Sequence, residues 1–170
     1  MNRRLIIYSL IYSLLVIAAI CISFYGGYIR VLNVVYFLTL ICMFPFILVY
    51  LWQLRNKEGG GFIGGRVAVK EGLKLVMLST VILCSFQAAF YTKDFKDYKV
   101  NHIRTIGPDV IKQEITKGQL KAKVEDIPKI IENDIKQVTM FAEVTAVLFK
   151  NVFYGALCCF VSAMIVKRRG

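Results

Sequence analysis

Long apolar runs are the feature that most constrains how this chain can fold. Residues 5–29 and 31–54 contain no charged side chain over 25 and 24 residues. A helix rises ~1.5 Å per residue, so about 20 apolar residues cross the ~30 Å hydrocarbon layer of a membrane. Both runs are therefore predicted to span a membrane. The first run also exceeds the ~7–15 apolar residues of a cleaved signal peptide, which predicts that it is retained.

Two further runs complete the predicted architecture. Residues 75–91 form an uncharged run of 17 residues, which one additional turn extends to 72–91. Residues 144–166 are long enough but include Lys150 and Asn151, which a span tolerates where the ammonium reaches an interface or faces protein. The predicted fold is all-α, a single membrane domain over residues 1–170 with four transmembrane helices.

The overall composition supports a membrane protein. Apolar residues make up 57% of the chain and charged residues 19%, and the mean hydropathy is +0.59. Soluble globular chains are about 45–50% apolar and about 25% charged. The composition therefore excludes a secreted disulfide scaffold, a disordered chain and a large multidomain enzyme.

The distribution of Lys and Arg predicts the orientation of the spans. The termini and the segment 55–74 hold ten basic residues and two acidic ones, whereas the segment 92–142 holds ten basic and eight acidic residues. Basic residues stay on the cytoplasmic side when loops are short. Both termini and the linker 55–71 are predicted to be cytoplasmic, and the segment 92–142 to be an extracytoplasmic insert. No nucleic-acid partner is predicted, because the basic residues do not interleave with aromatic ones on a soluble face.

The cytoplasmic linker is rich in glycine and leads into a basic stripe. Residues 58–65 include five glycines, and Arg66, Lys70 and Lys74 follow at a spacing of four. This spacing places the three cations on one side of a helix, where they are candidate contacts for anionic lipid headgroups. A phosphate-binding loop is not predicted, because no Gly-Lys-Ser/Thr follows the glycines and no strand precedes them.

The insert 92–142 has apolar residues at helical spacing. The Gly107-Pro108-Asp109 sequence predicts a helix start and Lys117-Gly118 its end, and a second helix over about 119–141 is expected to be interrupted at Pro128. The second helix carries an apolar stripe, which is either a partner-binding face or a face that packs within the insert. The candidate partner face consists of Val124, Ile127, Ile131, Ile135 and Val138. The two helices are predicted to pack on each other or to lie on the membrane surface.

Catalytic chemistry is not predicted for this chain. His102 is the single histidine, and no His-Glu-x-x-His or Gly-x-Ser-x-Gly sequence is present. The five cysteines lie within predicted spans and form no Cys-x-x-Cys pair. We therefore predict no catalytic residue, no cofactor and no metal ligand.

Polar residues at one end of the fourth span provide an alternative to a purely structural role. Glu143, Lys150 and Asn151 are a candidate intramembrane polar site, since ionisable groups within spans mark ion and substrate paths. Residues with small side chains recur every fourth position in the first and fourth spans, and this pattern favours close packing within the bundle over dimerisation. They include Ser9 and Ser13 in the first span, and Gly155, Cys159 and Ala163 in the fourth.

The order of these elements resembles that of a known family, the bacterial membrane family called domain of unknown function 4199. The resemblance covers about residues 5–169. The residues that carry it are Glu58, Gly59, Gly60, Phe62, Ile63, Lys70, Gly72, Phe90, Tyr91 and the tail Lys167-Arg168-Arg169. It implies a four-span inner-membrane protein of Bacteroidota-like bacteria and implies no known activity.

The sequence as a whole predicts an integral inner-membrane protein without enzymatic activity, acting as an accessory or interaction subunit of a membrane complex. The alternative is a small transporter or channel-like protein that uses Lys150 and its polar neighbours. The predicted partners are the lipid bilayer and either other membrane proteins or a second copy of the chain.

Overall fold

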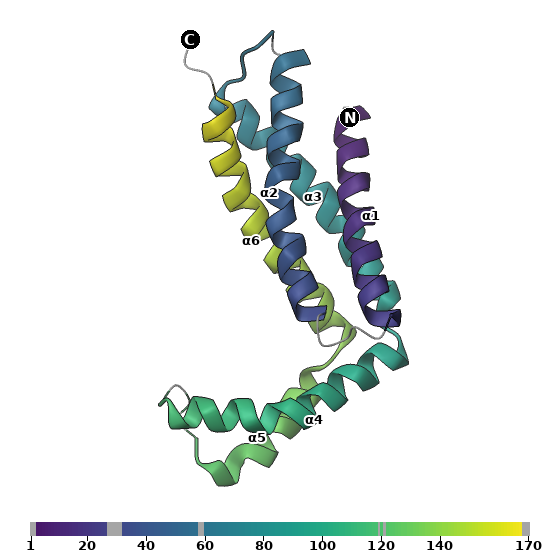
Figure 1. Ribbon diagram of the computed structural model, residues 1–170, viewed down its shortest axis with the longest axis vertical. Coiled ribbons are helices and arrows are strands. Elements are labelled where there is room, and N and C mark those ends of the chain that lie inside the picture. The colour runs from purple at the N-terminus through teal and green to yellow at the C-terminus, as the bar shows by residue number, and fades with distance from the viewer. Residues whose placement is uncertain (1–2, 27–31, 58–59, 119, 121, 168–170) are drawn as a thin grey trace. The chain divides into compact units, whose positions relative to one another are not determined.

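The described residues form six α-helices and contain no strand (Figure 1). The computed structural model describes residues 3–26, 32–57, 60–118, 120 and 122–167. The helices are α1 (Arg3–Tyr25), α2 (Leu32–Lys57), α3 (Gly65–Phe90), α4 (Lys93–Thr116), α5 (Ile127–Gln137) and α6 (Met140–Val166), with a 3-10 turn, η2 (Val124–Asp126), before α5. Helices α1, α2, α3 and α6 are long and apolar enough to cross a membrane. The predicted all-α fold with four apolar helices is confirmed.

The chain divides into two compact units. The first comprises residues 1–86 and 147–170, and the second residues 87–146. Helix α3 begins at Gly65, seven residues before the predicted start of the third span, so that the basic stripe is part of the helix. The predicted turn between the first two spans, at residues 25–30, lies mostly outside the described residues, as do Glu58, Gly59 and the end of the basic tail at 168–169.

In the first unit, hydroxyl groups of α1 contact backbone carbonyls of its neighbours. Tyr12 Oη donates a hydrogen bond to the carbonyl of Thr39 in α2 at 3.0 Å. Ser9 Oγ and Ser13 Oγ donate to carbonyls of α3 at 3.5 and 3.4 Å. Small side chains allow two helix backbones to come this close. The two serines are therefore part of the contact between α1 and α3.

Helix α6 packs against α2 and α3 through glycines. A Cβ at Gly155 would overlap the side-chain methyls of Val76 and lie 3.1 Å from Met43 Sδ. On the facing helix, a Cβ at Gly72 would lie only 2.9 Å from Cys159 Sγ. Gly155 and Cys159 are buried within the chain, as are Ser9 and Ser13. The small residues thus lie in contacts inside the bundle, as expected.

In the second unit, the predicted helix start at Gly107 is wrong, because α4 already begins at Lys93. Thr92 caps this helix: its Oγ1 accepts a hydrogen bond from the Phe95 N–H at 3.4 Å, and Asp94 occupies the first turn. Pro108 lies inside α4, where it removes one helical hydrogen bond without ending the helix.

Of the two other helix boundaries predicted in the insert, the structure contains one and lacks the other. The predicted end at Lys117-Gly118 is confirmed: Lys117 is the C-cap of α4, and Gly118 follows with a φ of +70°. The expected interruption of a longer helix at Pro128 is corrected. Pro128 lies in the first turn of α5, where its missing N–H would have no helical partner.

Helices α4 and α5 pack on each other, which is one of the two predicted arrangements. A Cβ at Gly107 would be in van der Waals contact with Ile131 Cγ1, at 3.7 Å, so α5 lies directly against α4 at this point. Ile111 of α4 and Ile127 of α5 are buried, with 6% and 5% of their surfaces exposed. The second unit therefore has a small apolar core of its own.

Candidate functional site

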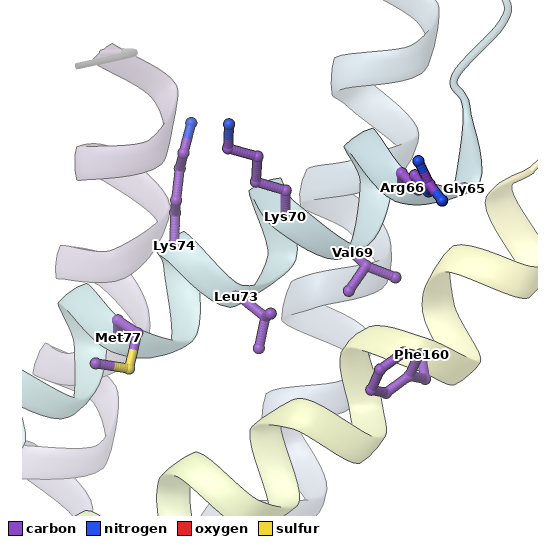
Figure 2. Close-up of a pocket in the computed structure, with 8 residues that line it drawn as sticks. All are labelled: Gly65, Arg66, Val69, Lys70, Leu73, Lys74, Met77 and Phe160. Carbon is purple, nitrogen blue, oxygen red and sulfur yellow. The ribbon is translucent and has the colours of Figure 1, made fainter.

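An open groove runs along α3 beside α6 in the first unit, with a volume of about 630 Å³. Figure 2 shows its basic side chains on one side and its apolar side chains below them. The groove is lined by Gly65, Arg66, Val69, Lys70, Leu73, Lys74 and Met77 of α3 and by Phe160 of α6. All three residues of the predicted basic stripe thus line it.

Two regular rows of side chains on α3 form this groove. The cations occupy positions 66, 70 and 74, and the apolar residues occupy positions 69, 73 and 77. Each apolar residue follows a cation by three positions, so the two rows run parallel about 60° apart around the helix. Phe160, with 53% of its surface exposed, adds an aromatic ring from α6. The groove is therefore amphipathic along its length.

The charge of the groove is only partly neutralised. Lys74 forms an ion pair with Glu71, whose other carboxylate oxygen accepts a hydrogen bond from Tyr50 Oη at 3.3 Å. Within the part of the chain that the structure describes, Arg66 and Lys70 have no acidic partner, and both are exposed. Two cations thus remain available to an anion.

The end of the groove at Gly65 is also basic. A Cβ at Gly65 would lie 3.5 Å from Cδ of Lys167, which follows the last residue of α6. Arg55 of α2 donates a hydrogen bond from Nη1 to the carbonyl of Val166 at 3.3 Å. This bond satisfies one of the carbonyls that the end of a helix leaves free. The contacts bring Lys167 to the same end of the first unit as the start of α3.

The candidate partner face on α5 is partly covered within the second unit. Ile127 and Val138 are buried, Ile131 and Ile135 are half-buried, and Val124 is 58% exposed. Helix α4 lies against this face at Ile131. Most of the apolar stripe is therefore occupied by packing inside the chain, and Val124 is its exposed member.

The three members of the candidate polar site have separate surroundings. Glu143 pairs with Lys99 of α4 at 3.3 Å. Lys150 is exposed, whereas Asn151 is 7% exposed and donates from Nδ2 to the carbonyl of Val147, one turn earlier in α6, at 3.0 Å. Among the described residues, these three side chains have no hydrogen-bond or ion-pair partner in common.

A buried aromatic ring connects the elements around Glu143. Phe95 is fully buried, with its ring centroid 5.3 Å from Phe90 and 6.0 Å from Tyr91, and Lys99 Nζ lies 5.6 Å from its centroid. Tyr91 Oη donates to the carbonyl of Val138 at 2.8 Å.

The apolar half of the groove was not predicted from the sequence. Its signal is present in the sequence, since Val69, Leu73 and Met77 repeat every fourth position beside the cations. Phe160 had no such signal, because it comes from a helix about 90 positions further along the chain. Lys99 was missed as the partner of Glu143 for the same reason.

Comparisons with known proteins agree with the resemblance seen in the sequence. The model of the family described as "Protein of unknown function (DUF4199)" matches residues 6–168. No curated protein and no solved structure matches the chain. Among the described residues, no three His, Cys, Asp or Glu side chains are grouped so that they could hold a metal ion.

Proposed function

We propose that this chain, which belongs to the DUF4199 family, is a non-enzymatic accessory subunit of a membrane complex. The observation that carries the proposal is the close packing inside the first unit. Gly155 and Gly72 bring α6 into direct contact with α2 and α3, and serine hydroxyls join α1 to α3. An interior closed by direct helix contacts suits a structural role better than a solute path.

The second unit offers a surface for the partner. Ile106 and Val110 of α4 are 44% and 45% exposed and lie one helical turn apart, so they are neighbours on one side of the helix. They flank the line of Ile103, Gly107 and Ile111 that faces the interior of the unit. We propose that a protein partner covers this pair.

Purification of the tagged full-length chain from its native membrane in mild detergent tests both statements. The wild type is expected to retain one partner at fixed stoichiometry, identified by mass spectrometry against an untagged strain. The variant Ile106→Ser/Val110→Ser is expected to lose it. The matched control Asn101→Ser/Lys112→Ser changes two exposed residues of the same helix that lie away from this pair and is expected to keep it. Elution of the wild type alone, or only as a dimer of itself, would contradict the proposal.

Transport remains the second candidate, and one observation favours it. Ser79 Oγ, Thr80 Oγ1 and Ser162 Oγ are buried and have no hydrogen-bond partner among the described residues. Unpartnered polar atoms in a helix bundle are places where a hydrated solute could be held. A Lys150→Met variant that inserts normally but loses the cellular role of the protein would favour transport over the accessory role.

A further inference from the structure

The groove along α3 combines the two properties that recognise a membrane lipid with an anionic headgroup. We propose that it binds one anionic phospholipid, with the phosphate at Arg66 and Lys70 and an acyl chain along Val69, Leu73 and Met77. This inference is independent of the accessory role, because it concerns the first unit and lipid rather than a protein partner.

Charge complementarity selects the headgroup. Arg66 and Lys70 have no acidic partner among the described residues, and they lie one turn apart, about 6 Å along the helix axis. A phosphate diester can accept hydrogen bonds from both, and the guanidinium of Arg66 can bind two phosphate oxygens at once. Lys167, close to Gly65, adds positive charge at the same end. A zwitterionic headgroup brings its own ammonium into this field and is therefore disfavoured.

The apolar row selects a lipid over a free phosphate. Val69 and Leu73 are half-buried and Met77 is exposed, and with Phe160 they continue the groove away from Gly65. Figure 2 shows Val69, Leu73 and Phe160 below the lysines, where an acyl chain would lie once its phosphate is held. The volume of about 630 Å³ is within the ~300–1,000 Å³ range of ligand sites. A soluble phosphate would leave this apolar surface uncovered.

Glu71 sets the strength of the site. Its carboxylate holds Lys74 and accepts a hydrogen bond from Tyr50, so the third cation of the stripe is already neutralised. A Glu71→Gln change keeps an oxygen that can accept from Tyr50 and releases Lys74 to the lipid phosphate. This change is expected to strengthen lipid binding, whereas removal of Arg66 and Lys70 is expected to weaken it.

A tryptophan placed in the groove can report the bound lipid. The chain has one tryptophan, Trp52. The full-length variant Trp52→Phe/Phe160→Trp therefore carries a single fluorophore at the groove. It is reconstituted into vesicles of phosphatidylcholine with increasing brominated phosphatidylglycerol, and separately with brominated phosphatidylcholine. Quenching of tryptophan by bromine requires close approach and so measures which lipid occupies the groove.

The expected result is stronger quenching by phosphatidylglycerol than by phosphatidylcholine. Each exposed cation near a membrane contributes roughly fivefold, so adding Arg66→Gln/Lys70→Gln is expected to weaken the preference about 25-fold. Adding Glu71→Gln is expected to strengthen it about fivefold. The matched control Lys112→Gln/Lys129→Gln removes two exposed cations of the second unit and is expected to leave the preference unchanged.

Three outcomes of the quenching measurements on these variants would overturn the proposal, and a competition with soluble phosphate can give a fourth. They are equal quenching by the two lipids, an unchanged preference in Arg66→Gln/Lys70→Gln with an unaltered melting temperature, and an equal loss in the matched control. If glycerol phosphate at submillimolar concentration abolishes the preference, the site binds free phosphate and the lipid assignment is wrong. Persistence of the preference in the presence of glycerol phosphate supports the lipid.

Discussion

Replacing Gly155 by leucine is expected to abolish the folded first unit, and replacing it by alanine to lower the free energy of unfolding by about 1–3 kcal/mol. A Cβ at Gly155 would overlap both methyl groups of Val76, so the Val76 side chain or α6 itself must shift to admit any side chain. Membrane helices associate mainly through close packing, which this movement removes. Helix propensity alone would make the alanine variant more stable, by up to about 1 kcal/mol. A net fall in its free energy of unfolding would therefore come from the steric overlap.

Thermal unfolding in detergent with a thiol-reactive fluorescent dye measures this effect, because Cys159 is fully buried and becomes reactive when α6 separates. The matched control is Gly64→Ala, since a Cβ at Gly64 has no neighbouring atom within 4 Å. The control is expected to melt within about 1–2 °C of the wild type. Equal melting temperatures for Gly155→Ala and the wild type would contradict the packing described for α6.

Replacing Tyr12 by alanine is expected to lower the free energy of unfolding by about 2–4 kcal/mol. The side chain is 1% exposed, and its ring lies 5.5 Å from that of Phe46. Truncation of a buried aromatic residue leaves a cavity that costs about 3–5 kcal/mol in soluble proteins. In a bilayer the cost is smaller, because the transfer of apolar surface from water contributes less.

The variant Tyr12→Phe distinguishes the contribution of the Tyr12 ring to stability from that of its hydroxyl group. It keeps the packing and removes the hydrogen bond to the Thr39 carbonyl, so a loss of about 0.5–1.5 kcal/mol is expected. Tyr154→Ala, at a position of α6 that is 40% exposed, is the control for loss of a tyrosine and is expected to cost less than Tyr12→Ala. The same dye assay applies to all three variants. A larger loss in Tyr154→Ala than in Tyr12→Ala would be incompatible with the core described for α1.

The spans could be predicted from the sequence because their signal is local. An apolar run of sufficient length is itself the property that places a helix in a membrane, and the described residues contain four such helices. The basic stripe could also be predicted, since a spacing of four fixes a side of any helix. The stripe at Arg66, Lys70 and Lys74 is accordingly found along one groove.

The remaining features depend on contacts between distant parts of the chain. Nothing near Glu143 in the sequence indicates that Lys99 is its partner, and nothing near Leu73 indicates the ring of Phe160. The error at Gly107 has a local cause, because glycine and proline are both disfavoured inside a helix and proline is favoured at a helix start, so the pair predicts a start that the longer α4 overrides. The cap at Thr92 and the contact of Gly107 with Ile131 favour the longer helix.

The arrangement of the chain across the membrane is the claim on which both proposals depend. Single cysteines introduced at Asn56, Lys112 and Lys167, all exposed positions, can be labelled with a membrane-impermeant maleimide, with the wild type as background. In intact spheroplasts, Lys112→Cys in α4 is expected to react, and Asn56→Cys and Lys167→Cys to react only after the membrane is opened. Labelling of all three positions from the same side would contradict four membrane crossings with the α4–α5 unit outside.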